Sequence, residues 1–328
     1  MNKHEAEVKR KRLLIIHPSR FRGGCEEYAM TIAREAARAG WAVSGAFPNT
    51  PENQTMIEDI QRLSPDARYH RLEIAEVLGR HGQNKRNVAK RFLRSLWLLL
   101  RHRPDVCLLA LPTVQYMMGT TLACGLLRIP AIVCFQYVHL FPAQGGCFDF
   151  PEWMLRLLAR ARRNRQQYVA ISENNRALIA RNFRMPEAEI EVIYNGASER
   201  FATITETERT RMRDKTRREL DIAEDETLML TVAALRWQKG HDLLLRVLPE
   251  ILDSYPRTRW VWAGDGDQRK EFEGRLEALG LRHAVRILGH RSDIDALLCA
   301  ADYFVFPTRF EGGQSFALGE AMMAGVPI

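Results

Sequence analysis

The chain has 328 residues, of which 46% are hydrophobic and 27% are charged, and its formal net charge is +8 at pH 7. This length and composition indicate a globular chain of two domains with large apolar cores. The six cysteines form no Cys-x-x-Cys pair and no zinc-ligand spacing, which predicts reduced thiols in a cytoplasmic protein. The apolar run Leu13–Ile16 is too short for a secretory signal, so we expect none.

The first part of the chain alternates between strands and helices, after a basic tail, 1–12, that we expect to be disordered. Apolar runs predict seven strands: Leu13–His17, Trp41–Ala46, Arg68–Ile74, Asp105–Leu111, Ala131–Phe135, Tyr168–Ile171 and Ile190–Tyr194. Helical periodicity predicts five helices: Cys25–Ala39, Arg80–Arg103, Tyr116–Leu127, Pro151–Arg165 and Glu173–Phe183. Strands that alternate with helices in this way predict a parallel sheet.

The positive charge is concentrated in the helix Arg80–Arg103, which carries eight Lys and Arg residues and no acid. The periodicity places apolar residues on one side: Val88, Phe92, Leu93, Leu96, Leu99 and Leu100. It places cations on the other: Lys90, Arg91, Arg94 and Arg101. Such a helix can touch anionic lipid at the inner membrane face, or it can pack on its own sheet with a solvated basic face; both readings stay open.

An uncharged stretch, Val106–Leu127, is long enough to span a bilayer. Pro112, Gln115 and two glycines interrupt it, so we predict a strand, a turn and a buried helix instead.

A charged segment that follows Ser198 contains a helix, Thr205–Leu220, and we place the domain junction near Ser198. A second series of strands then begins: Leu228–Ala233, Arg259–Ala263, Val285–Leu288 and Tyr303–Phe306. Its helices are Gly240–Tyr255, Gln268–Leu279, Ile294–Ala300 and Phe316–Ala324. The predicted fold is therefore α/β, with two tandem Rossmann-like doubly wound domains, 13–198 and 199–328, whose crevices face a central cleft.

The last strand, loop and helix form a candidate site. The loop Thr308–Gln314 contains Gly313, and Ser315 can cap the helix that follows. Free N–H groups at the start of a helix favour an anion, whereas the carboxylates of Glu311 and Glu320 suit sugar or ribose hydroxyls.

Cations follow another strand end. Arg236 and Lys239 come after Leu228–Ala233 and just before a helix, where they can clamp a diphosphate. Gly23 and Gly24 begin the first helix and let backbone approach a phosphate, although a glycine pair also fits a plain turn.

The segments Pro307-Thr-Arg-Phe-Glu-Gly and Glu320-Ala-Met-Met-Ala-Gly-Val-Pro together resemble the retaining family-4 glycosyltransferases, which have the GT-B fold. The resemblance extends over most of the chain. Three features depart from the family pattern: Glu311 and Glu320 are nine apart instead of eight, Ala234 replaces an arginine, and the series stops at Ile328 where the family continues. We therefore expect a C-terminally short member with an incomplete second domain.

The resemblance implies transfer of a hexose, with anomeric retention, from a nucleoside-diphosphate sugar to a glycan or glycolipid hydroxyl. Bacterial surface polysaccharide or lipopolysaccharide synthesis is the expected process. It also implies that the first domain holds the acceptor and that the second holds the donor. No metal-ligand cluster is visible in the sequence, so we expect no metal.

Residue chemistry and resemblance together assign two catalytic residues, Glu311 and His139. Gln136 is the alternative to His139, because it occupies the position of the family's histidine. The assigned donor-binding residues are Arg236, Lys239, Glu320, Gly23, Gly24, Gly313, Gln314, Ser315, His290 and Arg291.

Other functions remain open at this point. A nucleotide-sugar epimerase or phosphorylase could share this architecture, and so could a nucleotide-sugar-binding protein without turnover. A nucleic acid is not an expected partner, because no stacking aromatics interleave with the basic runs.

Overall fold

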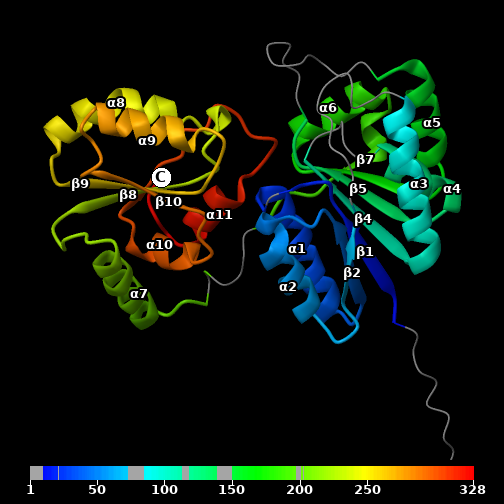
Figure 1. The fold of residues 1–328 in the computed structure, drawn as a ribbon, viewed down its shortest axis with the longest axis horizontal. Coiled ribbons are helices and arrows are strands. Elements are labelled where there is room, and N and C mark those ends of the chain that lie inside the picture. Colours follow the sequence, from blue (N-terminus) through cyan, green and yellow to red (C-terminus); the bar gives the residue numbers. More distant parts are fainter. Residues whose placement is uncertain are drawn as a thin grey trace, which may run out of the picture. The chain divides into compact units, whose positions relative to one another are not determined.

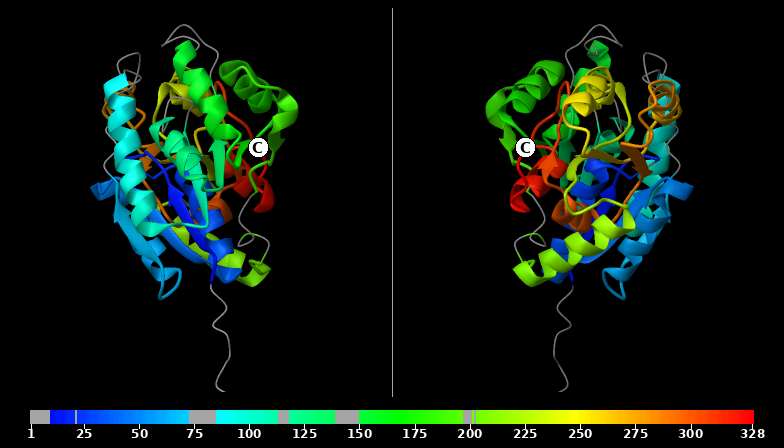
Figure 2. Two further views of the ribbon diagram at one scale, coloured as in Figure 1. Left: turned by 90° about the vertical axis from the view of Figure 1, so that its right-hand side faces the viewer. Right: turned by 90° about the vertical axis from the view of Figure 1, so that its left-hand side faces the viewer.

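The structure is a computed structural model that describes residues 10–20, 22–72, 85–112, 118–138, 150–196, 201 and 203–328. It divides into two compact units, one ending at Tyr194 and the other beginning at Asn195. The division comes slightly before the predicted junction at Ser198, which lies outside the described residues, as does most of the predicted tail. Each unit is a parallel sheet with helices on both faces, as predicted (Figure 1; Figure 2).

The first unit contains a seven-stranded sheet in the order β3-β2-β1-β4-β5-β6-β7. Its strands are β1 Arg12–Ile16, β2 Ala42–Phe47, β3 Arg68–Arg71, β4 Val106–Leu111, β5 Ala131–Phe135, β6 Gln166–Ala170 and β7 Ile190–Val192. All seven predicted strands are present, each shifted or shortened by a few residues at most. The strand β1 pairs in parallel with both β2 and β4, so the direction of winding reverses between β1 and β4.

The helices of this unit are α1 Gly24–Arg38, α2 Gln54–Arg62, α3 Lys85–His102, α4 Met118–Leu127, α5 Glu152–Arg162 and α6 Glu173–Phe183. Side chains of α3 to α6 share one apolar cluster with Leu14 and Ile16 of β1. The helix α2 was not predicted, although Met56, Ile57 and Ile60 give it a buried stripe.

Two glycines of α4 bring the helices of this layer close together. A Cβ on Gly119 would lie 2.6 Å from the backbone nitrogen of Phe92 in α3, and one on Gly125 would lie 2.5 Å from Cβ of Ala161 in α5. The prediction of a strand and a buried helix within 106–127 is confirmed in the described residues. Throughout the described part of the chain, no helix combines the length and apolarity needed to cross a bilayer.

The prediction for the two sides of α3 is partly wrong. Leu93 and Leu100 were placed on the packed side but are exposed, whereas Arg91 was placed outward and is buried. The reason is that α4 approaches α3 so closely that only a narrow stripe of α3, which includes Val88 and Leu99, faces the core. In α5, Leu157 is also partly exposed.

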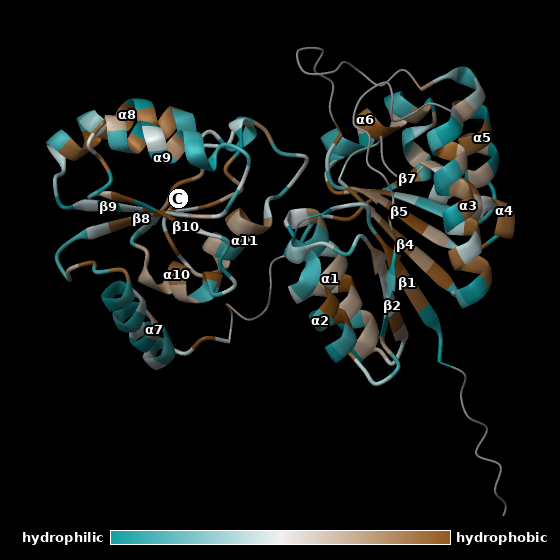
Figure 3. Cartoon of the chain, viewed as in Figure 1, coloured by the Kyte–Doolittle hydropathy of each residue, from teal (hydrophilic) through white to brown (hydrophobic). Residues whose placement is uncertain are grey.

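The second unit has a four-stranded parallel sheet in the order β10-β9-β8-β11. Its strands are β8 Thr227–Val232, β9 Thr258–Ala263, β10 Val285–Gly289 and β11 Tyr303–Phe304. Its helices are α7 Glu206–Glu219, α8 His241–Ser254, α9 Arg269–Ala278, α10 Ile294–Ala300 and α11 Phe316–Met323. Helix α7 is almost entirely hydrophilic (Figure 3).

β11 is shorter than the predicted Tyr303–Phe306. The backbone N–H of Val305 still donates to the carbonyl of Leu230 at 2.7 Å. The hydroxyl of Thr231 then donates to the carbonyl of Val305 at 3.0 Å, so a side chain takes over from the backbone ladder. The chain leaves the sheet at Pro307, which has no N–H to donate.

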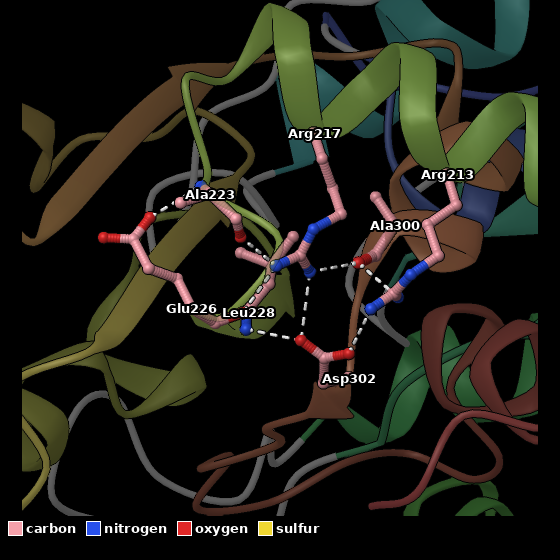
Figure 4. Close-up of polar contacts among 7 residues, drawn as sticks. All are labelled: Arg213, Arg217, Ala223, Glu226, Leu228, Ala300 and Asp302. Carbon is pink, nitrogen blue, oxygen red and sulfur yellow. Dashed lines mark hydrogen bonds and ion pairs between the residues drawn. The ribbon is translucent and has the colours of Figure 1, made fainter.

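A buried arginine of α7 holds the amino end of this sheet together (Figure 4). Arg217 donates to the carbonyls of Ala300, Ala223 and Glu226 and to the carboxylate of Asp302. Asp302 also accepts from Arg213 and, at 2.7 Å, from the backbone N–H of Leu228. The cluster therefore ties the first residues of β8 and β11 to the same helix.

Candidate functional site

The site lies in the second unit, at the carboxyl edge of its sheet. Because the four strands are parallel, the loops that follow them emerge at the same edge. The loops after β8 and β11 are immediate neighbours, because these strands are paired. This edge is where an open α/β sheet binds its ligands.

Gly240 allows the loops after β8 and β11 to touch. Its φ is +72°, in the left-handed region, and a Cβ at this position would lie 2.1 Å from the carbonyl oxygen of Pro307. Only glycine fits both constraints. The residue ends a short 3-10 turn, Trp237–Lys239, and directly precedes α8.

Hydrogen bonds join these two loops in register. The backbone N–H of Arg309 donates to the carbonyl of Gln238 at 2.9 Å, and the side-chain amide of Gln238 donates to the carbonyl of Phe310 at 2.9 Å. Bonds in both directions leave little freedom for one loop to slide past the other.

This register brings Lys239 and Glu311 into direct contact. The ammonium group of Lys239 donates to Oε1 of Glu311, and the hydroxyl of Thr308 donates to the same oxygen at 2.9 Å. The two side chains are 19% and 21% exposed, so the ion pair is accessible but partly shielded from water. A cation and a carboxylate in this position can serve a phosphate and a hydroxyl of one ligand.

A second ion pair, between Arg309 and Asp242, also joins the loop after β11 to the start of α8. Arg309 makes a two-pronged contact with Asp242, both hydrogen bonds being 2.7 Å, and its guanidinium lies 4.7 Å from the centre of the Trp237 ring. The bonds from Arg309 lower the pKa of Asp242, so this carboxylate stays charged near neutral pH. Sequence reasoning assigned no role to Arg309 or Asp242, although Arg309 stands inside the Pro-Thr-Arg-Phe-Glu motif.

Backbone contacts between the other loops complete this edge. The carbonyl of Ala233 would be 2.0 Å from a Cβ on Gly264, and the carbonyl of Leu235 would be 2.4 Å from one on Gly266. The N–H of Gly264 donates to the carbonyl of Gly289 at 2.8 Å. The Gly264–Gly266 turn is therefore required by close backbone packing, which the sequence pattern alone did not reveal.

Arg236 and the residues after β10 belong to the same edge but lie in different contacts. Arg236 is exposed, and its Nε is 4.0 Å from a carboxylate oxygen of Asp267. Arg291 forms an ion pair with Asp293, and His290 is exposed. These contacts place Arg236 on the loop after β8, and His290 and Arg291 on the loop after β10.

The remaining predicted residues of this unit surround the start of α11. Gly313 and Gln314 lie in the loop, and the carbonyl of Gln314 accepts from the side chain of Asn195 at 3.2 Å. Ser315 occupies the N-cap position, but its side chain makes no capping hydrogen bond, contrary to the prediction. Glu320 lies inside α11, in its second turn.

In the first unit, Gly23 and Gly24 lie at the start of α1, as predicted. The N–H of Gly23 is occupied, since it donates to the carboxylate of Glu26 at 2.9 Å. Burial raises the pKa of Glu26 above its ordinary value. Gln136 donates to the sulfur of Cys134 at 3.4 Å, and His139 lies outside the described residues.

His241, at the first position of α8, is a buried residue that sequence reasoning missed. Its ring packs edge-on against Trp262, with ring centres 4.9 Å apart. Burial lowers its pKa to about 4. The side chain is therefore neutral and structural, directly beside Gly240.

Sequence models of glycosyltransferases match both units of the chain. The sequence model described as Glycosyltransferase Family 4 matches residues 22–200, and the one described as Glycosyl transferases group 1 matches residues 212–328. An uncharacterised glycosyltransferase of Methanocaldococcus jannaschii is 33% identical over 166 residues, which cover 49% of this chain and 41% of that protein. Lipopolysaccharide glucosyltransferase WaaG of Escherichia coli is 29% identical over 107 residues, 33% of this chain and 28% of that protein.

This chain therefore matches less than half of the length of either relative. Among solved structures, Anabaena HepE in complex with UDP and glucose superposes with a TM-score of 0.70 at 20% identity, over 97% of this chain and 79% of that one. At this identity the likeness supports the fold.

Proposed function

The chain belongs to glycosyltransferase family 4, and from this premise we propose that it transfers a hexose from a nucleoside-diphosphate sugar to a hydroxyl group of a glycan or glycolipid. The observation that carries the proposal is the contact between Lys239 and Glu311 at the carboxyl edge of the second sheet. One group complements the diphosphate of such a donor, and the other complements its sugar. UDP-glucose is the first donor to test, since HepE was solved with UDP and glucose.

In the proposed reaction, the bond between the anomeric carbon and the diphosphate oxygen breaks with its electron pair on that oxygen. The Lys239 ammonium would stabilise this growing negative charge, as a fixed cation in a partly dehydrated site does well. Glu311 would hold sugar hydroxyls and face the positive charge that develops on the ring. Donor binding would thus replace the direct Lys239–Glu311 contact by two contacts to one molecule.

The acceptor oxygen forms the new bond to the anomeric carbon, and its proton passes to the departing phosphate. Attack from the side of the leaving group retains the anomeric configuration. This route needs no covalent nucleophile from the protein and no metal. In the first unit, the backbone at Gly24 is proposed to stabilise the departing diphosphate, and either Gln136 or His139 is proposed to face the transferred sugar.

The acceptor is proposed to be a surface polysaccharide or lipopolysaccharide intermediate, because WaaG is a lipopolysaccharide glucosyltransferase. Such acceptors would lie at the inner membrane face, where the basic helix α3 can touch anionic lipid.

Two substitutions test the site. In both Lys239→Ala and Glu311→Gln, kcat/KM for transfer from UDP-glucose should fall by about 100- to 1000-fold, the usual effect of losing one well-placed group. Lys270→Ala is the matched control, because Lys270 is an exposed cation of α9 in the same unit. Calorimetry should show weaker UDP binding in Lys239→Ala and unchanged binding in the control.

Unchanged turnover in both site variants would refute the assignment. Incubation with donor alone tests the epimerase alternative, since an epimerase converts the donor without any acceptor. UDP binding without product from any acceptor would instead support a binding protein without turnover.

A further inference from the structure

The outward face of α3 combines large apolar side chains with cations. Leu93, Trp97 and Leu100 are 61%, 63% and 53% exposed. Spaced four and three residues apart, they form one continuous stripe along the helix. The exposed cations on the same face are Arg86, Lys90, Arg94 and Arg101.

This stripe cannot turn into the core, because the opposite side of α3 is already packed against it. Val88, Leu98 and Leu99 are buried there, and the hydroxyls of Ser95 and Thr120 of α4 are hydrogen-bonded at 2.7 Å. The close approach of Gly119 to the backbone of α3 also fixes the rotation of the helix. The exposed apolar residues are therefore additional to those that the fold requires.

Charge narrows the kind of partner that this face can bind. The three helices α3, α4 and α5 carry nine Lys and Arg residues and a single carboxylate, Glu152. A second copy of the chain would bring equally positive helices against this face. A negatively charged surface with an apolar interior matches both the cations and the stripe.

We propose that the outward face of α3 is a docking surface for a bilayer rich in anionic phospholipid. The helix lies parallel to the membrane, with Leu93 and Leu100 in the acyl boundary and Trp97 at the level of the headgroups. Arg86, Lys90, Arg94 and Arg101 pair with lipid phosphates. The Arg101 guanidinium lies 5.8 Å from the centre of the Trp97 ring, so the two can enter the interface together.

The docking surface rests on the membrane contact included in the proposed function, and it identifies the residues that make this contact. The docking surface and the transfer activity can be refuted independently. Binding to lipid vesicles requires neither donor nor turnover. A chain that binds vesicles but transfers no sugar would overturn only the proposed activity, whereas an active chain that ignores vesicles would overturn only the docking surface.

The test is co-sedimentation of the full chain with vesicles. Vesicles of equal parts phosphatidylglycerol and phosphatidylcholine should bind the chain, and binding should weaken as salt is raised. Vesicles of phosphatidylcholine alone should bind it at least 10-fold more weakly. Equal binding to both compositions would overturn the role given to the cations.

Two sets of variants locate the surface. Each cation near an anionic bilayer contributes about fivefold to affinity, so a triple change should weaken binding by about 100-fold. That variant is Lys90→Gln, Arg94→Gln and Arg101→Gln. Trp97→Ser alone should weaken binding by about 10-fold or more, because it removes a large amphipathic ring from the interface.

The second unit offers matched controls for both. Tyr255 is an aromatic residue that is 67% exposed, so Tyr255→Ser tests the loss of an exposed ring elsewhere. Lys270→Gln with Arg282→Gln tests the loss of exposed cations elsewhere. Circular dichroism should show all variants folded, since every changed residue is exposed.

Loss of vesicle binding in the α3 variants, with the controls unchanged, supports the proposal. Wild-type binding by Trp97→Ser and by the triple variant would overturn it. Sedimentation velocity tests whether this face binds a second copy of the chain instead of a membrane. A wild-type dimer that Trp97→Ser converts to a monomer would show that it does.

Discussion

Replacing Gly240 by alanine should separate the two loops that carry Lys239 and Glu311. The new methyl group would lie 2.1 Å from the carbonyl oxygen of Pro307. That oxygen belongs to the backbone, so it cannot avoid the contact by rotating a side chain. One of the loops must therefore move by about 1 Å, against the hydrogen bonds that hold it.

The size of the effect follows from two contributions. An alanine at a φ of +72° costs about 1–2 kcal/mol in backbone strain, and the overpacked contact costs about 1–3 kcal/mol more. Gly280→Ala is the matched control, because Gly280 has a φ of +69° in the same unit and a Cβ there would meet nothing within 4 Å. It should show the strain of about 1–2 kcal/mol and no clash.

Thermal unfolding of the full chain measures both variants. For a unit of this size, about 4 °C is lost per kcal/mol, so the midpoint of the second unit should fall by about 8–20 °C in Gly240→Ala. In Gly280→Ala it should fall by about 4–8 °C. Bound UDP identifies the transition of the second unit, since a ligand raises the midpoint of the unit that holds it.

Calorimetric titration with UDP measures the separation of the loops. Binding should weaken by about 100-fold in Gly240→Ala, the cost of misplacing a site by 1 Å, and should be unchanged in Gly280→Ala. Equal midpoints and equal UDP affinities in the two variants would refute the reasoning, because they would show that the contact with Pro307 carries no energy.

Further predictions concern buried polar groups. Arg217→Met should destabilise the second unit by about 3–5 kcal/mol in thermal unfolding, because Asp302 loses its buried cation. The control is Arg218→Met in the same helix, which should cost less than about 0.5 kcal/mol because Arg218 is exposed. Burial raises the pKa of Asp302, but the bonds from the Leu228 N–H, Arg213 and Arg217 together lower it below its ordinary value. The contribution of Asp302 is therefore complete above the unfolded pKa and disappears as the pH falls below about 4, and in Asp302→Asn the loss of stability below pH 4 should be shallower. Burial lowers the pKa of His241 to about 4, so the second unit should lose about 3 kcal/mol as the pH falls from 6.5 to 4, and His241→Phe should remove that slope from denaturant titrations at several pH values.

Much of the fold could be predicted from the sequence, because strand and helix periods are local properties. The alternation along 13–198 and 228–324 matches the observed order of elements except for α2. The ends of elements were less certain, since tertiary hydrogen bonds decide them: β11 stops early because the Thr231 hydroxyl binds the Val305 carbonyl.

The candidate site was predictable as a set of residues but not as an arrangement. The Pro-Thr-Arg-Phe-Glu motif and the Lys239-Gly240 pair are visible in the sequence. Their contact depends on β8 and β11 being neighbours although β9 and β10 come between them along the chain. No local pattern specifies that pairing.

The sequence by itself determined the α/β class, the two series of elements, the family and the residue types available at each strand end. Only the tertiary structure decided that Lys239 meets Glu311, that Gly240 must lack a side chain, and that Leu93, Trp97 and Leu100 face outward. The reason is physical: backbone period depends on neighbours within a few residues, whereas contact and burial depend on which distant segments pack together.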